Sequence, residues 1–147
     1  MFTKLPKDMA LQKWFETAVH DYEIPVSDGL CIPVRTDRFL PAYAHTAVPK
    51  DTVYPWLTYE ASFAAFDAGD IPLIVNLWFH TFSEAIPNAA AQELSERIGL
   101  GGVQIPCMGG YIWLKRGSRF VQSVRDDADP YIKRRYIQLS AEYLTLN

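Results

Sequence analysis

The sequence has few cysteines and no long apolar run. Its two cysteines, Cys31 and Cys107, are too few for a disulfide framework and lack the CxxC spacing typical of zinc and redox sites. Charged residues interrupt every stretch of roughly 18 residues, so we expect no transmembrane helix. The opening residues MFTKLPKDM lack the apolar stretch of a secretory signal. These absences predict a soluble, cytoplasmic protein without a membrane partner.

Motifs for covalent or metal chemistry are also missing. The sequence contains neither a GxSxG nucleophile motif nor a Walker phosphate loop, and Gly101-Gly102 and Gly109-Gly110 resemble loop glycines. Its three histidines do not have the spacing of a zinc helix. The acidic cluster of Asp126, Asp127 and Asp129 lacks the glycine and the distal glutamate of a calcium loop, so we expect a solvated turn there.

Length and composition indicate one globular domain over residues 1–147. Hydrophobic residues make up 49% of the 147 residues and charged residues 21%, which excludes a disordered chain. A chain of this length buries a core without disulfides or a metal. Aromatic residues reach 14%, more than a small core needs, and such an excess favours a partner interface.

The N-terminal third divides into a helix and a proline-rich arm. Apolar residues at helical spacing predict an amphipathic helix over residues 8–21. Prolines then recur every eight residues in the arm, residues 24–52, at positions 25, 33, 41 and 49. Long segments of this kind are uncommon inside a domain and are usually functional. Phe39 and Tyr43 predict that the arm packs on another surface.

Residues 53–147 read as an α+β core. Alternating apolar residues predict strands over 53–64 and 71–82, and helical spacing predicts a second helix over 84–98 that ends at Gly99. The remaining expected elements are a flexible connection over 99–110, a hairpin of 111–115 and 119–124 with its turn at Gly117-Ser118, and a last strand over 131–145. Short turns between strands favour a mainly antiparallel sheet of about four to six strands, with two helices on one face and a long extended arm.

The charges divide unevenly along the chain. Residues 111–147 carry a net charge of +3, and residues 1–110 carry the balance of −6 within the overall −3. A basic end against an acidic remainder suits self-association through complementary patches. Nucleic-acid binding and an ordinary exposed surface are the alternatives.

The order of elements from Val53 to Thr145 resembles the tail terminator, or tail-completion, proteins of long-tailed bacteriophages with non-contractile tails. The features that carry the resemblance are an opening strand Tyr54–Tyr59, a strand that runs directly into a helix at Ser83-Glu84, a helix end at Gly99, a hairpin with Arg116-Gly117, a polar loop Arg125-Asp126-Asp127 and a final strand near Glu142-Tyr143. The N-terminal helix also fits this pattern.

The resemblance implies a structural role in the virion. Such proteins form a ring, typically a hexamer, on the head-proximal end of the tail tube. The ring stops tube polymerisation and offers a surface for head-completion proteins, and DNA passes through its lumen. Assembly takes place in the cytoplasm of the host bacterium. No catalysis and no cofactor are involved.

The ring model assigns roles to particular residues. We expect the contact between neighbouring subunits to use Arg116 and Arg119 of the expected hairpin and Phe39 and Tyr43 of the arm. We expect the polar loop of residues 126–129, with its carboxylates Asp126, Asp127 and Asp129, to face the lumen or the tube.

Three alternatives remain open. The chain is another head–tail connector or minor capsid component, or a protein-binding module that uses its exposed aromatic residues. It is otherwise a small metal-dependent nuclease, with Asp126, Asp127 and Asp129 as ligands.

Overall fold

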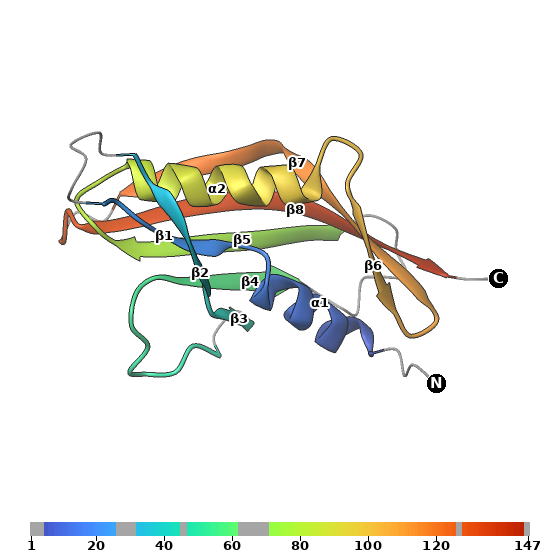
Figure 1. Cartoon of the computed structure of the whole chain (residues 1–147). Coiled ribbons are helices and arrows are strands. Elements are labelled where there is room, and N and C mark those ends of the chain that lie inside the picture. The colour runs from blue at the N-terminus through green and yellow to red at the C-terminus, as the bar shows by residue number, and fades with distance from the viewer. Residues whose placement is uncertain (1–4, 26–31, 45–46, 62–70, 126–127, 146–147) are drawn as a thin grey trace.

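The computed structural model describes residues 5–25, 32–44, 47–61, 71–125 and 128–145, with the side chains of 61, 118–120, 125 and 145 left out. Within these ranges the chain forms two helices and eight strands (Figure 1). They are α1 (Lys7–Glu16), β1 (His20–Glu23), β2 (Val34–Phe39), β3 (Ala42–Ala44), β4 (Trp56–Ala61), β5 (Ile71–His80), α2 (Ala85–Ile98), β6 (Val103–Cys107), β7 (Gly110–Arg125) and β8 (Ile132–Thr145).

Six of the strands form one sheet in the order β3-β4-β5-β8-β7-β6. All neighbours in this sheet are antiparallel except β3 and β4, which are parallel. Strands β1 and β2 form a separate antiparallel ribbon. The expected α+β class, with two helices and mostly strands, is therefore confirmed.

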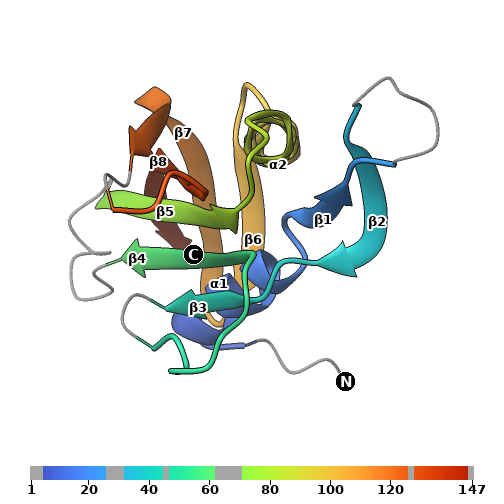
Figure 2. The ribbon, with the colours of Figure 1, turned by 90° about the vertical axis from the view of Figure 1, so that its left-hand side faces the viewer.

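The sheet buries one face under the helices. Leu73, Val75 and Leu77 of β5 are buried, whereas the residues between them are partly exposed, which gives the alternation of a sheet with one core face. Helix α2 contacts β5, β7 and β8, and α1 contacts both edge strands, β3 and β6. The sheet curls into a half-barrel with α1 in its opening (Figure 2). Both helices thus lie on the concave side.

The arm expected over residues 24–52 is not confirmed as an extended segment. Its described part contains β2 and β3, so one piece pairs with β1 and another extends the main sheet. The first helix is also shorter than expected, because α1 ends at Glu16 and His20 already begins β1. Figure 2 shows the ribbon of β1 and β2 projecting beside the curled sheet.

The hairpin expected around Gly117-Ser118 is wrong. Residues 110–125 form one strand, β7, which pairs with β8 along its length and shifts register between Arg116 and Val121. A Cβ atom at Gly117 would lie 2.7 Å from the carbonyl oxygen of Gln138. The glycine therefore marks a close approach between two strands at an irregularity, and not a turn.

The glycine-rich connection expected over residues 99–110 contains a strand. Strand β6 forms a tight hairpin with β7, in which Cys107 faces Gly110 across the turn at Met108 and Gly109. Gly99 ends α2 with a φ of 74°, as its position predicted, and Gly109 has a φ of 81°. These glycines provide left-handed backbone at a helix end and a turn.

Candidate interaction surface

A continuous row of aromatic rings runs from the outer face of β4 and β5 to the segments just beyond the strand ends. We call it the aromatic strip and define it as Tyr54, Trp56, Trp78, His80, Phe82 and Tyr131. The contacting pairs are Trp78–Trp56, Trp56–Tyr54, Tyr54–His80, His80–Tyr131 and Tyr131–Phe82, with ring centroids between 4.2 and 6.2 Å apart. Aromatic rings at such distances pack against one another, so the strip is one connected surface.

Strand register brings the two tryptophans together. Trp56 of β4 lies directly opposite Trp78 of β5, and their neighbours Leu57 and Leu77 point into the core. Because side chains alternate along a strand, both indoles lie on the outer face. The Trp78 Nε1–H donates to Thr58 Oγ1 at 3.1 Å, which fixes the orientation of that ring.

Arg134 and Asn76 place polar atoms beside the strip. The Arg134 guanidinium lies 5.1 Å from the centre of the Trp78 ring. Its Nε and the Oδ1 of Asn76 are buried, and neither has a hydrogen-bond partner among the described residues. Buried polar atoms are nearly always paired in a finished structure. Tryptophan, tyrosine and arginine are also the residues that dominate binding energy at protein interfaces.

The strip ends in exposed apolar side chains. Phe82 is 82% exposed, and Tyr131 beside it is 45% exposed. His80 Nε2 lies 3.0 Å from Asp129 Oδ2. The main-chain N–H of Tyr131, with a smaller effect of His80, lowers the pKa of Asp129, so this carboxylate stays charged next to the rings.

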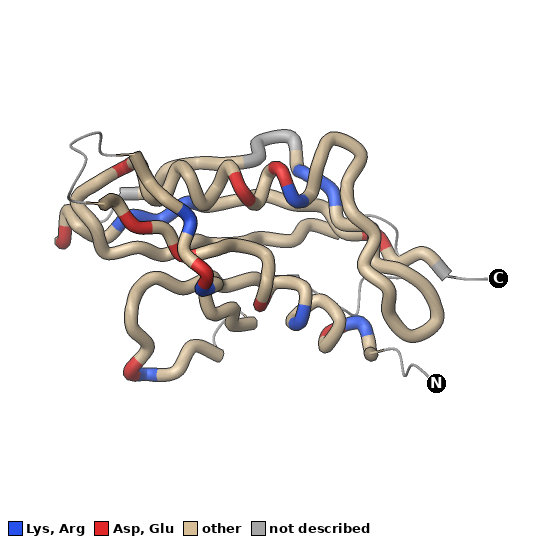
Figure 3. Tube along the Cα trace, viewed as in Figure 1, with Lys and Arg blue, Asp and Glu red and all other residues tan. Residues whose placement is uncertain are grey.

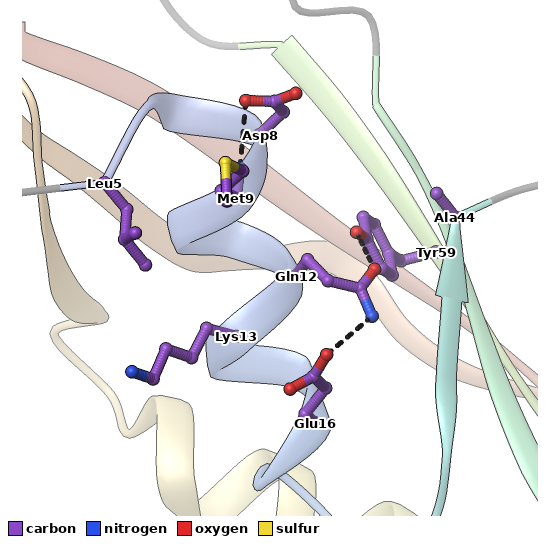
Figure 4. Close-up of a pocket in the computed structure, with 8 residues that line it drawn as sticks. All are labelled: Leu5, Asp8, Met9, Gln12, Lys13, Glu16, Ala44 and Tyr59. Atoms are coloured by element: carbon purple, nitrogen blue, oxygen red, sulfur yellow. Dashed lines mark hydrogen bonds between the residues drawn. The ribbon is translucent and has the colours of Figure 1, made fainter.

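A second surface is a groove between α1 and the edge of the sheet (Figure 4). We call it the α1 groove; it encloses about 660 Å³ and is lined by Leu5, Asp8, Met9, Gln12, Lys13, Glu16, Ala44 and Tyr59. Figure 4 shows Gln12 between Tyr59 and Glu16, with Lys13 extending from the other side of the helix. Gln12 Nε2 donates to the Ala42 carbonyl at 2.8 Å, and this bond ties α1 to the edge strand β3.

Acidic side chains outnumber basic ones in the lining of the α1 groove, with Asp8 and Glu16 against Lys13. Burial, together with the charges of Asp8 and Glu16, raises the pKa of Tyr59 to about 12. The Tyr59 hydroxyl donates a short hydrogen bond to Gln12 Oε1. No lysine or arginine within the described ranges pairs with Asp8 or Glu16. The groove therefore combines apolar walls with two carboxylates, Asp8 and Glu16, and one lysine, Lys13.

A buried carboxylate joins the β1–β2 ribbon to α2. Glu93 is 3% exposed, and its carboxylate accepts hydrogen bonds from the His20 main-chain N–H at 2.8 Å and from Tyr22 Oη–H at 3.1 Å. His20 Nδ1 lies 2.6 Å from it, and Arg97 donates to it at 3.4 Å. A carboxylate beside a histidine is also found in general-base catalysis. Here, however, main-chain, tyrosine and arginine donors from two elements all bind the carboxylate, which is typical of a structural contact.

The Glu93 carboxylate, which we call the Glu93 anchor, ionises more readily than an ordinary glutamate. Burial raises the pKa of Glu93, but the hydrogen bonds and charge of His20 and the charge of Arg35 outweigh burial and lower it below the ordinary 4.5. Within the part of the chain that the structure describes, no group of three His, Cys, Asp or Glu residues is placed to hold a metal.

The structure separates the residues expected at the subunit contact. Phe39 stacks on His20, with ring centroids 4.1 Å apart, and Tyr43 is half-buried in β3. Arg116 donates to the Gly99 carbonyl at 3.2 Å and to Ser95 Oγ at 2.8 Å, so it binds the C-terminal end of α2. Phe39 lies near Arg97 of α2, whereas Arg116 binds Ser95 and Gly99. These two expected contact residues therefore meet α2 at different positions.

The other expected site residues are only partly described. The side chain of Arg119 and residues Asp126 and Asp127 lie outside the described residues. Asp129 is the member of the acidic loop that the structure places, and it lies against His80 at the aromatic strip. Charges of both signs are spread over the helices and strands (Figure 3). Basic residues of β8 pair internally, as Lys133 and Arg135 do with Glu84.

The site residues expected from the sequence included neither the rings of the aromatic strip nor Glu93, apart from Asp129 beside the strip. The strip has a signal in the sequence, because Tyr54, Trp56, Trp78 and His80 occupy alternate positions of two expected strands. What the alternation does not give is the register that pairs Trp56 with Trp78. Glu93 has no such signal, since it looks like any other glutamate on a helix.

No helix among the described residues is long and apolar enough to span a membrane. The sequence matches no protein-family model, and comparison with curated proteins and with solved structures found no match.

Proposed function

We propose that this protein is a structural component of a bacteriophage virion that assembles into a ring of six copies and caps the head-proximal end of the tail tube. In this role it stops tube polymerisation and offers a surface to head-completion proteins, and DNA only passes through the lumen. The proposal is supported by two things. The order of elements expected over residues 53–145 resembles that of tail terminators, and one structural observation fits a contact between copies.

That observation is the aromatic strip. It joins the rings of Trp56, Trp78 and His80 on the outer sheet face to those of Tyr54, Phe82 and Tyr131 beyond the strand ends, and it lies beside a buried arginine Nε without a partner among the described residues. Such a surface is costly to leave in water and has the composition of an interface core. A surface that contacts a different surface on the next copy generates a ring when the rotation closes.

The same observation supports a second candidate, a monomeric module that binds another protein through the strip. Another head–tail connector component would share the ring and differ in what it contacts. The two candidate classes differ in self-association, which is directly measurable.

The test is the mass in solution over a concentration series, by light scattering after size exclusion, with negative-stain images of the same samples. Rings with a central hole, whose mass is a multiple of the protomer mass of 16.7 kDa, support the proposal. A monomer throughout the series contradicts self-assembly and favours the binding module.

A pair of variants connects the ring to the strip. Phe82→Ser removes the exposed ring at its end, and Leu100→Ser removes an equally exposed apolar side chain from the turn after α2. Because both side chains are more than 80% exposed, both variants should unfold at the wild-type temperature. We expect Phe82→Ser to lower the oligomer fraction and Leu100→Ser to leave it unchanged.

A further inference from the structure

We infer that the aromatic strip of one copy binds the α1 groove of the next copy, with Arg134 facing the carboxylates of Asp8 and Glu16. The inference rests on the proposed self-assembly and names the two surfaces that meet. It differs from the contact expected from sequence, which placed Arg116 and Arg119 at the boundary between subunits.

The apolar parts of the two surfaces fit one another. The α1 groove exposes Leu5 and Met9, and Met9 is 53% exposed. A methionine thioether makes favourable contacts with aromatic rings and adapts its shape to them. Docked on Trp56 and Trp78, it would cover the half-buried indoles that the fold leaves on the outer face.

The polar parts are complementary as well. Beside Trp78, the half-buried Arg134 carries a positive charge on the outer face of the sheet. The α1 groove is lined by the negative charges of Asp8 and Glu16 and by one positive charge, that of Lys13. A charged hydrogen bond between an arginine and a carboxylate is stronger than a neutral one, and it fixes the orientation of the two partners.

The two surfaces cannot meet within one chain. The strip lies on the outer face of β4 and β5, whereas α1 packs against the concave face, where Phe15 stacks on Tyr59 with 4.8 Å between ring centroids. The contact therefore joins different surfaces of two copies. Head-to-tail contacts of this kind are the ones that close into rings.

A charge-swap series tests the ion pair. Arg134→Glu and the double variant Asp8→Lys/Glu16→Lys should each weaken assembly at least roughly tenfold, since each places like charges across the contact. The triple variant with all three changes should recover most of the lost affinity. Arg38→Glu, which reverses the charge of an exposed arginine on β2 outside both surfaces, is the control and should assemble like the wild type.

Disulfide trapping tests the placement itself. Met9→Cys and His80→Cys are made separately in a Cys31→Ser background; His80 is exposed and lies two residues from Trp78 on the same face of β5. The remaining native thiol, Cys107, is buried. We expect a disulfide-linked dimer when the two proteins are mixed under mild oxidation, and none from either protein alone.

The outcomes separate this inference from the proposed function. Rings that form without the mixed disulfide and without rescue by the triple variant overturn the contact and leave the ring in place. A dimer trapped from Met9→Cys alone also overturns it, because that result requires like surfaces to meet. If neither the wild type nor any variant associates, both the proposed function and the proposed contact are overturned.

Discussion

The Glu93 carboxylate on α2 holds the β1–β2 ribbon in place by accepting hydrogen bonds from residues of β1 and from α2 itself. His20 and Tyr22 donate from β1, and Arg97 donates from the next turn of the helix. A buried carboxylate is stable only with such donors, because unpaired charge in a protein interior is costly. The position of one side chain thus determines where a whole strand pair lies.

Replacing Glu93 with glutamine should destabilise the protein and change its acid response. Hydrogen bonds to a charged group contribute roughly 1.5–3 kcal/mol, so we expect a loss of about 2–3 kcal/mol in the free energy of unfolding. Since folding lowers the pKa of Glu93 below 4.5, its contribution is present above that pH and lost as the pH falls through the folded pKa.

The measurement is urea unfolding between pH 7 and pH 3. Wild type should lose stability below about pH 4.5 more steeply than Glu93→Gln does. Glu96→Gln, an exposed change on the same helix, is the control and should stay within about 0.5 kcal/mol of wild type. Parallel pH profiles for Glu93→Gln and wild type would show that Glu93 is not the group responsible.

Two neighbouring glycines should respond differently to alanine. Gly102 has a φ of 83°, and a Cβ there would lie 2.6 Å from Trp113 Nε1, whereas a Cβ at Gly101 would have no atom within 4 Å. We expect Gly102→Ala to cost about 1–3 kcal/mol and Gly101→Ala to be nearly neutral, as measured by thermal unfolding. Equal effects would mean that the β6 hairpin adjusts to accept a side chain.

Among the elements, the β1–β2 ribbon depends on contacts outside itself. Two-stranded ribbons are marginally stable alone, and this one lacks a third strand within the described part of the chain. Its buried neighbours, Val19 and Leu40, link it to the core at one end, where Leu40 N–H donates to the Val19 carbonyl at 2.8 Å. Its docking on α2 then relies on Glu93.

Amide hydrogen exchange should detect that dependence. In Glu93→Gln we expect faster exchange in β1 and β2, while the central strands β5 and β8 exchange at the wild-type rate when corrected for global stability. Uniform acceleration across all elements would contradict a local role for the anchor.

Strand β7 shows how tertiary pairing overrides a local turn signal. Gly117-Ser118 favours a turn, yet β8 is long enough to pair with residues on both sides of it. The ladder continues past the glycine as an irregularity, because hydrogen bonds to β8 satisfy more backbone groups than a turn would.

At the scale of the whole molecule, assembly should change tryptophan fluorescence. Trp56 and Trp78 lie on the proposed contact, so their emission should shift to shorter wavelength and be quenched less by acrylamide as concentration rises. Trp78→Phe should reduce the change, whereas Trp14→Phe, which replaces an indole packed on Phe15 near the core, should preserve it. A growing mass with constant emission would place the contact elsewhere.

The sequence alone determined the α+β class, the second helix with its end at Gly99, and the two alternating strands before it. These follow from periodicity and from glycine, which act over a few residues. Only the tertiary structure decided the order of the sheet, the continuous β7, the pairing of Trp56 with Trp78 and the burial of Glu93. Strand register and burial depend on contacts between residues far apart in the chain, such as His20 and Glu93. A local sequence pattern does not indicate which distant residues form these contacts.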